Sequence, residues 1–205
     1  MSIREVHPAG RRPLDRSVGP GPATPASELL PDRMDLRRPP APDAGLRQAC
    51  DGFDLWPGRS CIQEAAPNLC ITNVFGARKL AQLQQARISH VVICADELPE
   101  AFPNHFAYLK LTGLVDNTGT PLLPYLRKAL PWIKDAQDRG GRVLLHCASG
   151  SSRSGAVLIA YLMWQQDLTV DQALALARRS RPIIAPNPGF YEQLEASQSF
   201  LRGAL

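Results

Sequence analysis

Residues 143–164 read VLLHCASGSSRSGAVLIAYLMW. Residues 143–145 are apolar and few enough for a buried strand, and residues 157–164 form a longer apolar run that favours a helix. Between Cys147 and Arg153, at the junction of the two runs, all residues are small. A strand, a tight loop of small residues and a helix N-terminus together make a cradle for phosphate. We therefore predict an anion-binding loop at this junction.

The cysteine at the base of the loop suggests that the bound phosphate is attacked as well as held. Cysteine thiols beside a helix N-terminus or an arginine ionise more readily than free thiols, so we expect Cys147 to be a thiolate at neutral pH. Arg153 offers a planar fork of donors that matches two phosphate oxygens, which lysine would not. Gly150 permits a positive φ at little steric cost. The thiolate would then form a covalent phospho-cysteine.

The neighbouring residues fit supporting roles in the same chemistry. Ser154 could donate a hydrogen bond to the sulfur when it becomes a leaving group. His146 is interpreted as a brace for the loop and not as a general base, because an ionised thiol needs none. The backbone N–H groups of the loop would form a nest for an anion, with short side chains that allow a close approach; these residues are Ala148, Ser149, Gly150, Ser151, Ser152 and Arg153.

The order His-Cys-x-x-Gly-x-x-Arg-Ser in residues 146–154 resembles the signature of the cysteine-dependent protein tyrosine phosphatases. Downstream, AYLM at 160–163 and RPIIAPNPGF at 181–190 resemble the dual-specificity subgroup, in particular its small atypical members. The resemblance covers residues 60 to 201. It implies hydrolysis of phosphotyrosine, phosphoserine and phosphothreonine in proteins through a phospho-cysteine intermediate.

A general acid must protonate the leaving oxygen, and such an acid typically contributes about 10²–10⁴-fold to the rate. Asp116 is the only acidic residue between Glu100 and Asp135, and it lies between a strand-like and a helix-like segment. The resemblance implies that Asp116 is this acid, and then the base that activates water. The alternative is that Asp116 caps a turn or the next helix. Asn117 is a weaker candidate for a helping role.

Two further groups of residues leave alternatives open. Cys94 ends a strand expected to lie beside that of Cys147, and the resemblance implies a reversible disulfide between them; the alternative is a small buried hydrophobic residue. Three arginines near one helix end either complement the helix C-terminus or form a rim that attracts a second phosphate. We favour the first reading for these arginines, which are Arg178, Arg179 and Arg181.

Strand-like and helix-like segments alternate from residue 60 onward. This alternation predicts a three-layer α/β/α fold with a mostly parallel central sheet of about five strands, similar to protein tyrosine phosphatases, with the site at the carboxyl ends of the strands. We expect Pro131 to kink or restart one helix. The predicted strands are 60–63, 69–72, 89–94, 106–111 and 142–147, and the predicted helices are 75–85, 122–137, 154–165, 170–180 and 188–201.

The first part of the chain differs in composition from the rest. Residues 1–60 hold ten of the nineteen prolines and no lysine. We predict a disordered or weakly ordered extension over 1–55 and a catalytic domain over 56–205. RRPL at 11–14 and RR at 37–38 resemble docking motifs for a protein kinase, and solvated arginines are the alternative. The net charge of +4 favours acidic phosphoprotein substrates and is too small to indicate nucleic acid.

Five cysteines, an odd number, argue against a secreted disulfide framework, and no apolar run is long enough to span a bilayer. We expect a monomer in the cytoplasm, with the nucleus as the alternative, and no cofactor. His90 and His105 stand alone, so no metal is expected. Two other functions remain: an inositol-lipid phosphatase, which usually carries lysines in its loop where this chain has none, and a phosphate-binding scaffold with little turnover.

Overall fold

The computed structural model describes residues 60–203, so the predicted N-terminal extension and its basic motifs lie outside the described residues. Their centre is a five-stranded sheet in the order β1-β2-β5-β3-β4. β1 pairs with β2 in the antiparallel sense, and the other neighbours are parallel, which confirms the mostly parallel sheet. The strands are β1 (Gln63–Ala66), β2 (Leu69–Thr72), β3 (His90–Ile93), β4 (Ala107–Lys110) and β5 (Val143–His146).

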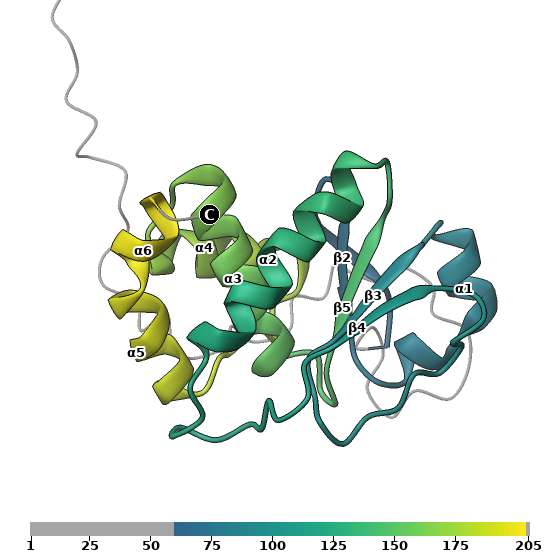
Figure 1. The fold of residues 1–205 in the computed structure, drawn as a ribbon, viewed down its shortest axis with the longest axis horizontal. Coiled ribbons are helices and arrows are strands. Elements are labelled where there is room, and N and C mark those ends of the chain that lie inside the picture. The colour runs from purple at the N-terminus through teal and green to yellow at the C-terminus, as the bar shows by residue number, and fades with distance from the viewer. Residues whose placement is uncertain (1–59, 204–205) are drawn as a thin grey trace, which may run out of the picture. The chain divides into compact units, whose positions relative to one another are not determined.

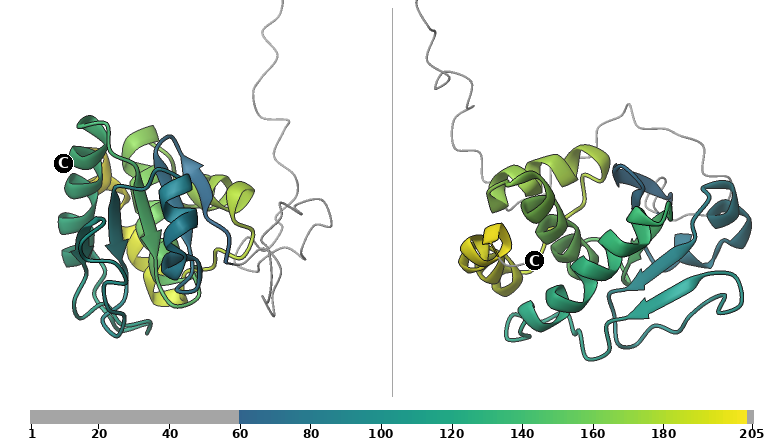
Figure 2. Two further views of the ribbon diagram at one scale, coloured as in Figure 1. Left: turned by 90° about the vertical axis from the view of Figure 1, so that its right-hand side faces the viewer. Right: turned by 45° about the horizontal axis from the view of Figure 1, so that its top comes forward.

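Helices cover both faces of the sheet. Figure 1 shows α1 on one side and α2 to α6 on the other, and the two views of Figure 2 agree. This arrangement confirms the expected three layers. The helical elements are the 3₁₀ turn η1 (Gly76–Arg78), α1 (Leu80–Gln85), α2 (Leu123–Asp138), α3 (Arg153–Gln166), α4 (Val170–Ser180), α5 (Pro188–Ala196) and α6 (Gln198–Gly203).

The predicted anion loop joins a fully buried strand to a largely buried helix. All four residues of β5 are buried, and β5 lies between β2 and β3. The first eleven residues of α3, Arg153 to Met163, are buried as well. Because strand and helix are both fixed by core packing, the loop between them starts and ends at defined points.

Two local predictions near the start of the described chain are wrong. The first strand is Gln63–Ala66 and not 60–63, and its turn includes Asn68, which adopts a left-handed φ of 57°. The predicted helix 75–85 is interrupted at Lys79, whose φ and ψ of −101° and 81° are not helical. Phe75, an apolar residue at the start of that predicted helix, is 62 % exposed. The apolar spacing across this segment therefore does not reflect a single helix.

The other departures lie in helices. α2 is one helix with Pro131 inside it, so the helix does not restart there, and the expected kink stays a prediction. Pro131 is exposed, whereas Leu130 and Ile133 on the same helix are buried. The predicted last helix ends at Ala196, and Ser197 separates it from α6. Within residues 60–203, none of the helices has the length and hydrophobicity needed for a bilayer span.

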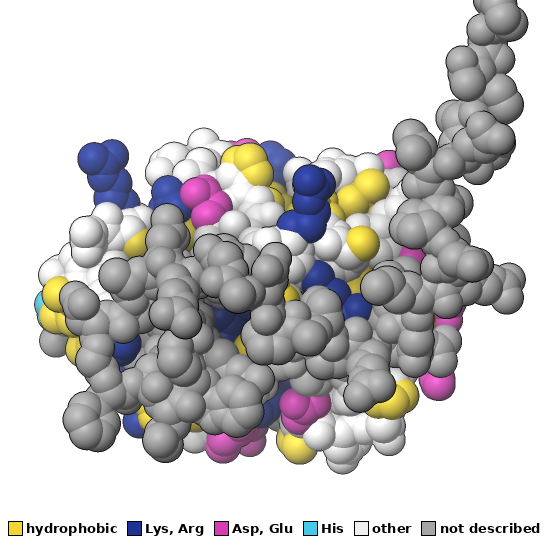
Figure 3. Space-filling model, turned by 180° about the vertical axis from the view of Figure 1, so that it is seen from behind, with side chains coloured by type: hydrophobic (Ala, Val, Ile, Leu, Met, Phe, Trp, Pro, Cys, Tyr) yellow, Lys and Arg dark blue, Asp and Glu magenta, His cyan; other side chains and the backbone are white. Residues whose placement is uncertain are grey.

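Cysteine usage and surface charge bear on the remaining expectations. Of the four cysteines among the described residues, Cys61 is disulfide-bonded, and Cys70, Cys94 and Cys147 are free. On the face seen in Figure 3, Lys and Arg side chains stand among Asp and Glu side chains. Positive and negative side chains are therefore mixed on this face, as far as the described residues form it.

Candidate active site

The carbonyl oxygens of the loop are bound by groups outside it. Ala148 O accepts a hydrogen bond from the backbone N–H of Val74 at 3.2 Å, and Ser151 O accepts one from Ala185 at 3.3 Å. The guanidinium of Arg181 donates from Nε to Gly150 O at 2.7 Å and from Nη2 to Ser149 O at 3.3 Å. Four successive carbonyls are thus held from outside the loop.

This arrangement leaves the N–H groups on the inner side of the loop, because the C=O and N–H of one peptide unit point in opposite directions. Gly150 N–H donates to the Cys147 Sγ at 3.2 Å, which shows where the inner side lies. Gly150 has a φ of 68°, and a Cβ at this position would stand 2.5 Å from Thr72 O. The predicted positive φ at Gly150 is confirmed, and the close approach of Thr72 O is a second reason for glycine at this position.

Cys147 lies at the base of this loop, on the side to which the Gly150 N–H points, and is fully buried. Its Sγ is 3.2 Å from Ser154 Oγ, the distance expected of a hydrogen bond to sulfur. His146 precedes it at the end of β5 and is 3 % exposed. Burial lowers the pKa of His146 to about 4, against a smaller raising effect of the Cys147 backbone. His146 is therefore neutral near pH 7, and its bracing role stays a prediction.

Arg153 is the first residue of α3, and only 7 % of its side chain is exposed. Its Nη1 contacts both carboxylate oxygens of Glu97, at 2.7 and 2.8 Å. Its Nε lies 3.8 Å from Asp116 Oδ2 and, among the described residues, makes no hydrogen bond. A buried guanidinium with one arm fixed and an open donor beside the thiol is suited to bind an oxyanion.

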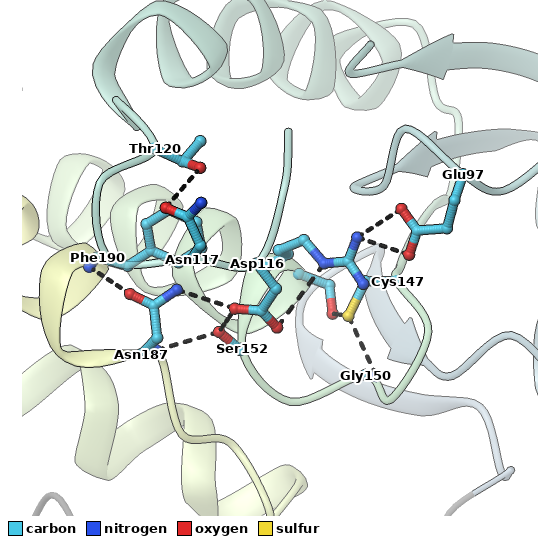
Figure 4. A network of polar contacts seen from close by, with 11 residues as sticks. Glu97, Asp116, Asn117, Thr120, Cys147, Gly150, Ser152, Asn187 and Phe190 are labelled. Atoms are coloured by element: carbon cyan, nitrogen blue, oxygen red, sulfur yellow. Dashed lines mark hydrogen bonds and ion pairs between the residues drawn. The ribbon is translucent and has the colours of Figure 1, made fainter. Parts of the chain in front are cut away.

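Asp116 reaches the loop from the segment that follows β4, as Figure 4 shows. Its Oδ1 accepts hydrogen bonds from Ser152 Oγ at 2.6 Å and from Asn187 Nδ2 at 2.9 Å. The predicted acid and the predicted phosphate loop thus lie in direct contact. Asn117 Oδ1 accepts from the Gly119 N–H at 2.8 Å and shapes the turn, and its helping role stays a prediction.

Three residues at this site were missed in the sequence. Glu97 was not considered, and it is the residue that fixes one arm of Arg153. Arg181 was assigned to a helix terminus or a phosphate rim, but it is 1 % exposed and holds the loop carbonyls. Asn187 caps α5 by accepting from Phe190 N–H at 2.9 Å and also contacts Asp116.

Arg178, which was grouped with Arg181 in the sequence, is also buried and donates from Nε to Ile184 O at 2.8 Å. Among the loop serines, Ser151 donates to Ile183 O at 2.6 Å. Ser151 and Ser152 thus use their hydroxyls to fix the loop and its neighbours.

Cys94 follows β3, next to β5. Its N–H donates to His146 O at 2.8 Å, which places it beside Cys147 at the end of the neighbouring strand. Both residues are fully buried. Burial, and to a lesser degree the nearby Cys147 sulfur, raise the pKa of Cys94 well above its usual value. Cys94 is therefore a neutral thiol, available as either a packing residue or a partner for Cys147.

Known phosphatases are similar to this chain in sequence. A family model described as the dual specificity phosphatase catalytic domain matches residues 71–200. Protein phosphatase Slingshot homolog 3 of Rattus norvegicus is 38 % identical over 66 % of this chain and 21 % of its own length. Dual specificity protein phosphatase 1B of Arabidopsis thaliana is 34 % identical over 73 % of this chain and 89 % of its own length.

The fold is shared with solved structures as well. A mouse putative dual specificity phosphatase, solved in complex with zinc tungstate, superposes with a TM-score of 0.66 and 28 % identity, over 75 % of this chain and 95 % of that one. The chain spans about a fifth of the length of the Slingshot relatives it matches. With the family model covering most of residues 60–203, the chain belongs to the dual specificity phosphatase catalytic domain family.

Proposed function

We propose that the chain hydrolyses phosphotyrosine and phosphoserine or phosphothreonine esters on proteins through a phospho-cysteine intermediate. The observation that carries this proposal is the orientation of the loop: its carbonyls are bound from outside, and its Gly150 N–H points at the Cys147 sulfur. Such a loop binds an oxyanion and places it against a nucleophile.

In the first step the Cys147 thiolate attacks phosphorus, the S–P bond forms and the P–O bond to the substrate breaks. The inner N–H groups and Arg153 bind the three non-bridging oxygens as charge shifts onto the leaving oxygen. Asp116, which lies between Ser152 and Asn187, donates its proton to that oxygen. The products are a protonated side-chain hydroxyl and phospho-cysteine.

In the second step Asp116, now a carboxylate, takes a proton from water. The water oxygen attacks phosphorus, the S–P bond breaks and inorganic phosphate leaves. The sulfur departs as a thiolate, and Ser154, whose Oγ is 3.2 Å away, stabilises it by a hydrogen bond. The enzyme returns to its starting protonation state.

Apolar side chains near the loop favour a protein substrate. Phe75 and Val115 are the large hydrophobic residues exposed within the described part of the chain, at 62 % and 50 %. Phe75 follows Val74, which donates to the loop, and Val115 precedes Asp116. Phe75 follows β2 and Val115 follows β4, and these two strands lie on opposite sides of β5 in the sheet. The two side chains therefore place apolar surface on either side of the bound phosphate.

The decisive experiment compares the wild-type chain with Cys147→Ser on phosphotyrosine and phosphothreonine peptides. The serine variant loses turnover but still binds tungstate and phosphopeptide, because the loop donors remain. Cys70→Ser, a change at a free cysteine on β2, is the matched control and keeps its activity. If Cys147→Ser turned over phosphopeptide as fast as that control, the mechanism would be wrong.

An inositol-lipid phosphatase is the alternative enzyme, and soluble inositol phosphates assayed beside the peptides separate the two. The uncharged side chains of Ala148 and Ser149 give extra phosphates no cation within the loop. A phosphate-binding scaffold would bind tungstate without turnover in the wild-type chain. The kinase contact, the monomeric state and the cytoplasmic location stay predictions.

A further inference from the structure

The segment that carries the acid is held against helix α5 along much of its length. We call residues 112–122 the acid segment. It contacts α5 and its N-cap at three successive places, one through each of Asn187, Gly189 and Gln193. None of these contacts involves a group that would bind phosphate.

The first contact is at Asp116 itself. Asn187 Nδ2 donates to Asp116 Oδ1 at 2.9 Å, while the Asn187 backbone N–H donates to Ser152 Oγ at 3.1 Å. Ser152 Oγ in turn donates to the same Asp116 oxygen at 2.6 Å. The N-cap of α5, the phosphate loop and the acid thus form one closed hydrogen-bonded triangle, which Figure 4 shows.

The second contact is a close backbone approach. A Cβ built on Gly189 would stand 2.1 Å from Thr118 O and 2.7 Å from Thr118 Cα. Gly189 is buried, and Thr118 belongs to the acid segment. Because real Cβ atoms do not approach backbone this closely, only glycine at this position lets the acid segment pack against α5.

The third contact fixes the end of the acid segment. Gln193 Oε1 accepts from Leu122 N–H at 2.6 Å, and its Nε2 donates to Thr120 O at 2.9 Å. The same Nε2 also donates to Gly189 O at 3.1 Å. One amide side chain therefore satisfies backbone groups on both sides of the contact.

We propose that α5 keeps the acid segment docked before substrate binds, so that Asp116 stands at the phosphate loop in the free protein and no closing movement is needed. Asn187, Gly189 and Gln193 are then positioning residues, which act on the reaction through Asp116. This inference rests on the proposed function for its kinetic consequence, whereas the docking itself is a property of the fold.

The test uses two pairs of variants of the full chain. Gly189→Ala forces the acid segment away, and its control is Gly119→Ala, in the same segment, where the added Cβ meets only Asn117 Oδ1 at 3.5 Å. Gln193→Ala removes the third contact and is the variant to use if Gly189→Ala does not fold. Its control is Glu195→Ala, at an exposed position of the same helix.

Each protein is assayed for kcat/KM on a phosphotyrosine peptide and on an aryl phosphate whose phenol is strongly acidic. The value of kcat/KM reports the first step, and only the peptide needs a proton from Asp116. We expect Gly189→Ala and Gln193→Ala to lose about 10- to 100-fold on the peptide and less than about threefold on the activated ester. Both controls keep the wild-type ratio of the two substrates.

If kcat/KM fell equally on the peptide and on the activated ester, the positioning role would be overturned. The same holds if the ratio of the two kcat/KM values matched that of the controls. Amide hydrogen exchange gives a readout that does not depend on activity: Leu122 N–H exchanges faster in Gln193→Ala than in Glu195→Ala if the docking is as proposed. A wild-type chain that turned over neither substrate would refute the proposed function, yet this difference in exchange would still support the docking. Unchanged exchange in Gln193→Ala would refute the docking.

Discussion

Asp116 Oδ2 lies 3.8 Å from Arg153 Nε, so the predicted proton donor already faces the predicted phosphate-binding cation. Because Nη1 is already bound to Glu97 and Nε makes no hydrogen bond among the described residues, Nε is open to a phosphate oxygen. A phosphate oxygen bound at Nε therefore takes the place that Asp116 Oδ2 holds in the free protein. The free protein keeps the arginine near its working position through its contacts with Glu97 and Asp116.

The first prediction concerns the acid. Asp116→Asn keeps an oxygen for Ser152 but cannot give up a proton, so kcat/KM on a phosphotyrosine peptide falls by about 100- to 1,000-fold. The loss shrinks as the leaving phenol becomes more acidic, which a series of aryl phosphates measures. Asp135→Asn, an exposed change on α2, is the control. Equal losses across the series would remove Asp116 from this role.

The second prediction separates charge from position at Glu97, which is 53 % exposed beside a nearly buried Arg153. Burial tends to raise the pKa of Glu97, but hydrogen bonds to its own backbone and to Arg153 outweigh it, so the pKa is lowered and the group is ionised. Glu97→Gln removes a repelling charge but leaves an acceptor for Arg153.

We expect Glu97→Gln to bind tungstate about fivefold tighter, since a charge several ångströms away in a high effective dielectric is worth about 1 kcal/mol. Glu97→Ala binds it more weakly than wild type, because Arg153 loses the group that orients it. Calorimetry measures both affinities. The same affinity for the two variants would show that Glu97 acts through its charge alone.

The third prediction concerns the second chemical step. Ser154→Ala removes the hydroxyl 3.2 Å from the Cys147 sulfur, so the thiolate leaves less readily from phospho-cysteine. We expect kcat to fall by about tenfold or more while kcat/KM changes less than about threefold. Rapid-quench measurement should show a burst of released phenol equal to the enzyme concentration. Ser180→Ala, on α4, provides a control that gives no burst.

The fourth prediction concerns Cys94, the neighbour of Cys147. Hydrogen peroxide oxidises the Cys147 thiolate to a sulfenic acid; the Cys94 thiol then attacks that sulfur, an S–S bond forms and water leaves. Peptide mapping without reductant detects the link, and thiol treatment restores activity. In Cys94→Ser, activity is lost irreversibly. Recovery of Cys147 sulfinic acid alone from the wild-type chain would leave Cys94 as a packing residue.

The fifth prediction follows from the buried, neutral His146. Its pKa is about 4 in the folded chain and 6.5 when unfolded, so between these values the unfolded chain binds a proton that the folded chain does not. Stability therefore falls as pH drops from 6.5 to 4, by up to about 3 kcal/mol. Urea unfolding of His146→Gln should show a flatter pH dependence than His105→Gln, which changes an exposed histidine. Parallel curves would contradict the prediction.

The parts of the fold that the sequence predicted well carry a strong local signal. Helix α4 spans Val170–Ser180 as expected, because Thr169 caps its start, with Gln172 completing the capping box, and Pro182 follows its end. β5 and α3 were predicted to within one or two residues because their apolar runs are continuous. β1 was misplaced because QEAA has no strand periodicity and forms only against β2.

The same difference between local and long-range signals explains which residues of the site could be predicted from the sequence. Cys147 and Arg153 share one loop, so their spacing alone predicted their meeting. Glu97 and Arg181 reach that loop from the end of β3 and from beyond α4, and no local pattern distinguishes a carboxylate or a guanidinium that will find a distant partner. Only the order of strands in the sheet and the packing of α4 bring them together.

Because Val74 after β2, and Arg181 and Ala185 after α4, hold the loop's carbonyls from two separate parts of the chain, residues 146–156 are not a portable module. Grafting them onto another strand–helix junction would transfer the nucleophile but not the outside donors, and the peptides would be free to flip. A designed phosphatase therefore needs the outside donors as well as the loop sequence. A search for active relatives should require an arginine at the position of Arg181, immediately before Pro182, in addition to the cysteine.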